Sequence, residues 1–208
     1  HMYQEKGRHI ITSPIEHKAV LDTCKRLEQE GFEITYLDLD PSGRVTVQQV
    51  ADAIREDTIL VTIMAANNEV GTLSPIGEIG KLCHDKGVIF HTDAAQSVGK
   101  VPMDVEAMSL DLVSISGHKI YGPKGIGALY VRRRKPRVRL VPIIDGGGHE
   151  RGMRSGTLPV ASIVGLGEAC RLAGEEMEGE ARYLDSLVER MHSKIFAELD
   201  QVYLNGHP

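Results

Sequence analysis

Residues 88–97 read Val-Ile-Phe-His-Thr-Asp-Ala-Ala-Gln-Ser, and the fold can be worked out from this stretch. Its first five residues are apolar or β-branched apart from one histidine, which is typical of a buried strand. Asp93 and Gln96 follow in a turn of small residues that leaves space for a ligand. Open α/β sheets hold their ligands at the carboxyl ends of their strands. The stretch therefore predicts a buried strand that delivers a carboxylate and an amide to a binding site.

Other β-rich runs alternate with helical patterns on both sides of this stretch. The predicted strands are Arg8–Thr12, Glu33–Leu37, Thr58–Met64, Val88–Thr92, Leu112–Ser116 and Ile126–Arg132. Apolar residues at near-helical spacing predict helices over Ile15–Leu27, Val47–Ile54 and Ile76–Leu82. Gly31 and Gly87 suit left-handed C-terminal caps, and Pro75 suits a first helical turn. The alternation predicts an α/β fold with a mostly parallel sheet between helices.

From about Pro159 the pattern changes to one long helical stretch that reaches Leu199 and contains four glycines. His1-Met2 looks like a cloning remnant, and the chain stops in a turn-like sequence, so we expect part of a longer protein. The expected units are a sheet domain at 3–158, incomplete at its N-terminus, and a helix with the truncated start of a second domain at 159–208.

The composition is that of an ordinary folded chain. Of the 208 residues, 41% are hydrophobic and 25% charged, which argues against disorder. The net charge of −5 is too small to indicate a nucleic-acid binder. No run approaches the roughly 18 to 20 apolar residues of a membrane span, and no signal peptide is recognisable. Three widely spaced cysteines disfavour a disulfide framework and fit a reducing, intracellular compartment.

The glycine clusters do not match known phosphate or metal motifs. Gly122 and Gly127 have the spacing of a Walker A loop but are not followed by Lys-Ser/Thr. Residues 146–152 place their last glycine one position late for a dinucleotide fingerprint. His149-Glu150 lacks the second histidine of a helical zinc-protease motif. We therefore expect no metal site.

A second strand end carries a hydroxyl, an imidazole and an amine in a row. Residues 112–125 read Leu-Val-Ser-Ile-Ser-Gly-His-Lys-Ile-Tyr-Gly-Pro-Lys-Gly. A lysine directly after an apolar strand is either a surface turn lysine or a functional amine. Together with Asp93, these groups would hold pyridoxal 5′-phosphate (PLP). Lys119 would form a Schiff base, Ser116 and His118 would bind the phosphate, and Asp93 would pair with a protonated ring nitrogen.

Three long motifs, in one order, resemble the cysteine desulfurases of the NifS/IscS type. They are H-T-D-A-A-Q-S at 91–97, S-G-H-K-I-Y-G-P-K-G-I-G at 116–127 and G-G-G-H-E-R-G-M-R-S-G-T at 146–157. The resemblance covers nearly the whole chain. It implies a PLP-dependent enzyme of fold-type I, like aspartate aminotransferase, with 3–158 as a PLP-binding large domain in three αβα layers.

The resemblance also implies a role for eight residues. Around the cofactor ring, His17 stacks on the pyridine, Asn68 lies near the phenolic oxygen and the substrate carboxylate, Asp93 holds the ring nitrogen protonated, and Gln96 donates to the phenolic oxygen. Ser116 and His118 bind the phosphate, and Lys119 forms the Schiff base. Thr157 reaches the cofactor phosphate of the neighbouring subunit, which implies a homodimer. Without the resemblance, each is equally a helix-start, N-cap or turn residue. We expect partial desolvation and the nearby cations His118 and Lys124 to activate Lys119.

In this family, L-cysteine displaces the lysine and an enzyme thiolate attacks the substrate sulfur, which leaves L-alanine and an enzyme persulfide. That sulfur serves iron–sulfur cluster assembly and tRNA thiolation. The thiolate belongs to a small-residue S-x-x-C-type loop, whereas Cys24, Cys83 and Cys170 lie on predicted helices, where small buried roles are expected. The upstream phosphate loop and the arginine that binds substrate carboxylate are also absent, so we expect this portion to be inactive alone.

Two other functions stay open from the sequence: a selenocysteine lyase or aminotransferase of the same fold, and a non-catalytic interaction domain. The resemblance implies iron–sulfur scaffold, ferredoxin- or frataxin-like and sulfur-acceptor proteins as partners, without direct binding to nucleic acid or membrane. It also implies a bacterial cytoplasm, with the mitochondrial matrix as the alternative.

A basic run lies at 132–139, where six of eight residues are cationic (Arg-Arg-Arg-Lys-Pro-Arg-Val-Arg). It is either a docking face for acidic proteins or a solvated edge kept from pairing by its charges and proline. Relatives use a basic surface near the active site to receive acidic partners, which favours the docking interpretation. Nucleic acid is disfavoured because no aromatic residue interleaves with the charges.

Overall fold

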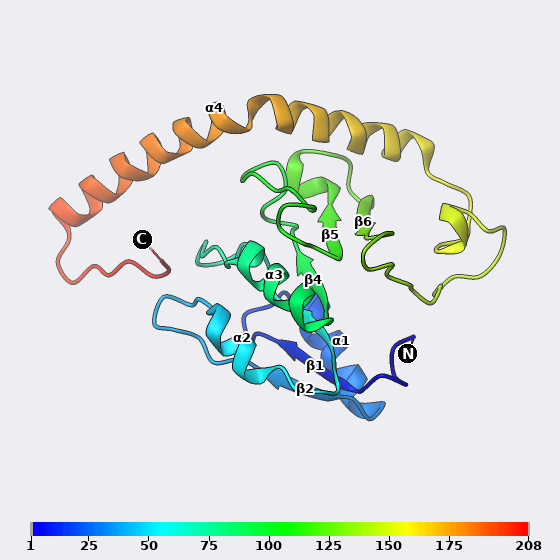
Figure 1. Cartoon of the computed structure of the whole chain (residues 1–208). Coiled ribbons are helices and arrows are strands. Elements are labelled where there is room, and N and C mark those ends of the chain that lie inside the picture. The colour runs from blue at the N-terminus through cyan, green and yellow to red at the C-terminus, as the bar shows by residue number, and fades with distance from the viewer. Residues whose placement is uncertain (1, 208) are drawn as a thin grey trace.

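The computed structural model describes residues 2–207 (Figure 1). His1 of the expected cloning remnant and Pro208 at the end of the expected second unit lie outside the described residues. The elements are β1 (His9–Thr12), α1 (Lys18–Gln29), β2 (Glu33–Tyr36), α2 (Val47–Ala53), β3 (Thr58–Thr62), α3 (Ile76–Lys86), β4 (Ile89–Asp93), β5 (Leu112–Ser116), the 3₁₀ turn η1 (Gly117–Ile120), β6 (Gly127–Val131), the 3₁₀ turn η2 (Glu150–Gly152) and α4 (Val160–Glu198).

The six strands form one sheet in the order β2-β1-β3-β4-β5-β6. Strands β1 to β5 are parallel, and β6 is antiparallel to β5. The strand order reverses at β1, because β2 lies on one side of it and β3 on the other. Right-handed crossovers then place α1 on one face and α2 and α3 on the other. The predicted α/β fold is confirmed, and each predicted strand lies within two residues of its expected bounds.

The helix ends follow the local signals in the sequence. Gly87 caps α3 in the left-handed conformation at φ +69°, and Gly31, just beyond α1, has φ +85°. Thr46 and Gln49 form a reciprocal capping box at the start of α2. Pro75 immediately precedes α3 and does not lie inside its first turn, one position earlier than predicted. These caps fix the positions at which the chain enters and leaves the sheet.

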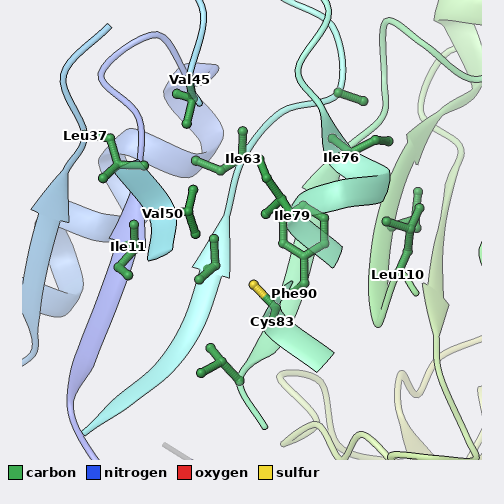
Figure 2. Close-up of a cluster of buried hydrophobic side chains, with 14 of the residues drawn as sticks. Ile11, Leu37, Val45, Val50, Ile63, Ile76, Ile79, Cys83, Phe90 and Leu110 are labelled. Carbon is green, nitrogen blue, oxygen red and sulfur yellow. The ribbon is translucent and has the colours of Figure 1, made fainter. Parts of the chain in front are cut away.

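The main hydrophobic core lies between the sheet and the helices α2 and α3. In Figure 2, Ile11 and Phe90 of the sheet face Val50 of α2 and Ile79 and Cys83 of α3. All five side chains are fully buried. Burial of each large apolar side chain contributes roughly 1.5–3 kcal/mol, so this cluster anchors the strands whose ends carry the polar residues.

The predicted long helix is a single 39-residue element, α4, and its glycines do not interrupt it. Only Leu166 and Ala169 of its described side chains are buried, where they pack against Ile120 of η1. Beyond this contact the helix runs past the sheet (Figure 1). Its second half exposes the large apolar side chains of Tyr183, Leu184, Leu187, Val188, Met191 and Phe196.

Candidate functional site

A pocket of about 470 Å³ opens at the carboxyl ends of the parallel strands. It is lined by His17, Ala19, Met64, Asn68, Asp93, Ala95, Gln96, Ser114, Ile115, Ser116, His118 and Lys119. Seven of the eight residues predicted from the sequence line it, and Thr157 does not. These seven are the last residues of β4 and β5 or lie in the segments that follow β1, β3, β4 and β5, which meet at one edge of the sheet because those strands are parallel. The fold therefore brings distant polar side chains into one cavity.

His17 reaches the pocket as the N-cap residue of α1. Its Nδ1 accepts a hydrogen bond from the Ala19 amide at 3.2 Å, which orients the ring against the first helical turn. The ring therefore has both the helix-start role and the pocket position that the sequence left as alternatives.

Asp93 is the last residue of β4, and one of its oxygens accepts a hydrogen bond from the Ala95 amide at 2.9 Å. This contact closes the small-residue turn that begins there. Gln96, in the same turn, accepts through Oε1 from Lys100 Nζ at 3.1 Å. The turn thus presents a carboxylate and a carboxamide to the pocket from a rigid strand end.

The end of β5 and the turn η1 present three further polar groups. Ser116 Oγ and His118 Nδ1 lie 3.1 Å apart, and Lys119 follows directly. The turn is closely packed: a Cβ at Gly117 would lie 2.9 Å from the Ile126 carbonyl oxygen. The partial desolvation expected for Lys119 is wrong for this chain, because η1 lies at the open side of the pocket, where the His118 and Lys119 side chains are exposed.

A polar ladder beside the pocket was not predicted from the sequence. His91 in β4 hydrogen-bonds through Nδ1 to Thr62 Oγ1 at 2.7 Å and through Nε2 to Ser114 Oγ at 2.9 Å. Burial lowers the pKa of His91 to about 4, and the charge of Asp93 opposes this more weakly, so the ring is neutral at pH 7. The period of two along a strand places His91 and Asp93 on one face, a signal that could have identified this ladder.

Thr157 lies outside the pocket, in the exposed loop between η2 and α4. Its predicted contact is with the cofactor of a neighbouring subunit, so its place within a single chain does not test that role.

None of the three cysteines lines the pocket. Cys24 and Cys83 are buried as predicted, and burial raises their thiol pKa values to about 11 and about 12. The burial expected for Cys170 is wrong: this side chain is exposed. It borders a hollow between α4 and the sheet face that includes Val113 and Ile115.

The basic run at 132–139 is divided between two environments. Arg132 is buried, with its Nε 3.2 Å from Asp111 Oδ1 and its NH1 2.8 Å from Glu106 Oε2, so it belongs to the fold. The other five cations of the run are exposed. The antiparallel register pairs Ser116 with Gly127 and Leu112 with Val131, so the run begins at the edge of the sheet opposite the pocket. The position near the pocket that the resemblance implied is not found within this chain.

Residues 2–207 contain neither a candidate membrane span nor a candidate metal cluster. No helix in that range is long and apolar enough to cross a bilayer. In the same range, no three His, Cys, Asp or Glu side chains are grouped so that they could hold a metal ion.

Over residues 1–208 the chain matches the family model described as aminotransferase class-V. The chain belongs to this family. It is 60% identical to the cysteine desulfurase IscS of Glaesserella parasuis serovar 5 over 206 residues, which are 99% of this chain and 50% of that relative. The chain thus spans about half the length of the curated relatives it matches.

Solved structures of class-V members superpose closely on the chain. A NifS-like protein aligns with a TM-score of 0.89 at 41% identity, over 94% of this chain and 53% of that one. SspA, solved in complex with cysteine, aligns with a TM-score of 0.77 at 55% identity, over 81% of this chain and 48% of that one.

Proposed function

We propose that this chain forms the PLP-binding part of a cysteine desulfurase, which converts L-cysteine to L-alanine and passes the sulfur on. The observation that carries the proposal is the single pocket lined by His17, Asn68, Asp93, Gln96, Ser116, His118 and Lys119. The 60% identity to a cysteine desulfurase and the likeness to a structure that holds cysteine support it.

The residues present fit PLP in size and chemistry. A volume of about 470 Å³ lies within the usual range of about 300–1,000 Å³ for small-molecule sites. An amine at Lys119 suits an aldehyde, and a carboxylate at Asp93 suits a protonated ring nitrogen. The hydroxyl and imidazole of Ser116 and His118, 3.1 Å apart, can both donate to one phosphate. The set therefore matches the three functional parts of this cofactor.

Each side chain then has a definite task. Lys119 attaches the cofactor and moves protons at the substrate α-carbon, and His17 covers the ring from the start of α1. Asp93 keeps the ring nitrogen protonated, and Gln96 donates its amide to the phenolic oxygen. Asn68 orients that oxygen and the substrate carboxylate. When bound, PLP supplies an electron sink next to the α-carbon.

Removal of sulfur also needs a thiolate. Its attack forms an S–S bond to the substrate sulfur as the Cβ–S bond breaks, and protonation of the carbon leaves alanine. Because Cys24, Cys83 and Cys170 all lie away from the pocket, the proposal places this thiolate outside the described part of the chain. The same applies to the arginine that binds the substrate carboxylate.

The proposal extends to assembly. Residues 3–158 form the cofactor domain, and 159–208 lead into a second domain. In a homodimer, Thr157 serves the partner subunit's cofactor from its exposed loop. The exposed cations of 133–139 bind acidic ferredoxin- or frataxin-like proteins. The other partners are an iron–sulfur scaffold and sulfur-acceptor proteins. The protein acts in a bacterial cytoplasm. Because this surface begins at the edge opposite the pocket, such partners leave the pocket of the same chain open.

Titration with PLP and then L-cysteine tests the proposal. Binding in the pocket gives a yellow absorption that borohydride removes and that L-cysteine changes. The Lys119→Ala variant, under identical conditions, controls for the reaction of free PLP with cysteine. Identical spectra for the two proteins would contradict the proposal.

A further inference from the structure

A buried carboxyl group lies directly behind the pocket wall and has no role in the function proposed above. Glu16 is 4% exposed, and it precedes His17 in the loop between β1 and α1. Its Oε1 accepts two hydrogen bonds, from the Met64 amide at 2.7 Å and from Ser13 Oγ at 3.0 Å. Its Oε2 is buried and has no hydrogen-bond partner within residues 2–207.

These contacts join the two loops that carry pocket residues. Ser13 and Glu16 close the turn that leads to His17, and the Met64 amide belongs to the segment that leads to Asn68. A second contact reinforces the junction, because Asn67 Nδ2 donates to the Ile15 carbonyl at 3.1 Å. His17, Met64 and Asn68 all line the pocket. Glu16 thus sits where the β1–α1 loop is fastened to the end of β3.

A buried carboxyl group at this position reduces the stability of the fold when it is ionised. Burial raises the pKa of Glu16 to about 7, and the negative charge of Asp93 adds to the effect, while the Met64 and Ser13 hydrogen bonds oppose it. The stability that Glu16 provides is present below pH 4.5, the usual range of the group, and is lost as the pH rises toward 7. An unpaired buried oxygen adds a further cost. The ionised group therefore destabilises the fold above about pH 7.

We propose that Glu16 is a positioning residue for the cofactor pocket: its Oε1 fastens the His17 loop to Met64 and so holds His17 and Asn68 at a fixed separation. The inference rests on the proposed function, because a pre-organised pocket matters only if it binds a ligand. Without the Met64 contact, the two loops keep the Asn67–Ile15 hydrogen bond but are held less firmly, so the ring-binding side of the pocket is less well ordered.

The test compares Glu16→Ala, Glu16→Gln and a control, Glu28→Ala, which removes an exposed glutamate of α1. Three measurements are made on the whole chain: hydrogen exchange of the Met64 amide, the Kd for PLP, and the visible circular dichroism of bound PLP, which reports how the ring is held. Glu16→Ala should accelerate Met64 exchange and weaken PLP binding by about tenfold each and reduce the dichroism. Glu16→Gln keeps an acceptor oxygen and should recover most of all three, and Glu28→Ala should match the unmodified chain.

The outcomes separate this inference from the proposed function. If Glu16→Ala leaves Met64 exchange, PLP affinity and dichroism unchanged, or if Glu16→Gln is as defective as Glu16→Ala in all three, Glu16 does not act through the Met64 contact and the inference is wrong. If the unmodified chain does not bind PLP, both the proposed function and the positioning role are wrong. Hydrogen exchange of the Met64 amide then shows only whether Glu16 joins the two loops. Should Glu16→Ala not fold, Glu16→Leu takes its place, because leucine fills similar space but offers the Met64 amide no acceptor oxygen.

Discussion

The two ends of the parallel strands carry their charges in opposite ways. At the amino end, Asp111 and Arg132 are both buried and lie 3.2 Å apart, so each charge neutralises the other. At the carboxyl end, Asp93 and Lys119 line one pocket, and no ion pair joins them within residues 2–207. Charges that are paired with each other hold the fold together, whereas charges that converge without pairing are available to a ligand.

Breaking the Asp111–Arg132 pair should have the largest effect on the free energy of unfolding. Arg132→Ala leaves Asp111 buried without its counter-charge, and the Leu110 and Val105 carbonyl oxygens each lose a guanidinium donor. We expect the free energy of unfolding, measured in urea, to fall by about 3–5 kcal/mol. The matched control is Arg133→Ala, an exposed cation of the same run, which should change it by less than about 0.5 kcal/mol. Equal effects of the two variants would show that the buried pair does not stabilise the sheet.

At the carboxyl ends of the strands, the contribution of His91 to the stability of the fold depends on pH. The folded state lowers the pKa of His91 from 6.5 to about 4, so its stabilising contribution is complete above pH 6.5 and is lost as the pH falls toward 4. Relative to His91→Gln, the unmodified chain should lose about 2–3 kcal/mol of unfolding free energy between pH 7.5 and pH 4.5.

The comparison with His91→Gln is needed because the contribution of Glu16 to the free energy of unfolding changes in the opposite direction over this pH range. The measurement is urea unfolding of both proteins at several pH values, with His149→Gln, an exposed histidine outside the pocket, as control. A difference between the unmodified chain and His91→Gln that stays constant with pH would exclude the buried neutral histidine.

A smaller and more selective effect is expected at Asp93. Asp93→Asn keeps an oxygen for the Ala95 amide but removes the charge, so the unfolding free energy should stay within about 0.5 kcal/mol while the Kd for PLP rises at least about tenfold. Asp104→Asn is the matched control, because Asp104 also accepts backbone amides, from Glu106 and Ala107, but lies outside the pocket. If both substitutions weaken binding equally, Asp93 is only a turn residue.

Much of this arrangement could be predicted from the sequence. The strands are short, β-branched runs between turn signals, and their parallel order places everything that follows a strand at one edge. For this reason Asp93 and Lys119, 26 positions apart in the sequence, could be assigned to one site in advance.

The errors share a physical cause, which is that local sequence does not say what covers a side chain. Arg132 was grouped with a basic surface, but its partner Asp111 lies 21 positions earlier and draws it inside. Cys170 was expected to be buried, but it borders a hollow that α4 leaves beside the sheet. Lys119 was expected to be partly desolvated, and it is exposed. Each outcome depends on contacts between segments that are distant in the sequence.

The central claim is that the carboxyl-end pocket is a PLP site whose amine is Lys119. The chain is incubated with about one equivalent of PLP and reduced with borohydride, and the modified lysines are then mapped by peptide mass spectrometry. The account predicts one dominant adduct at Lys119, absent in Lys119→Ala and unchanged in Lys86→Ala, which removes an exposed lysine at the end of α3 that does not line the pocket. An adduct spread over surface lysines, with Lys119 no more modified than Lys86, would contradict it.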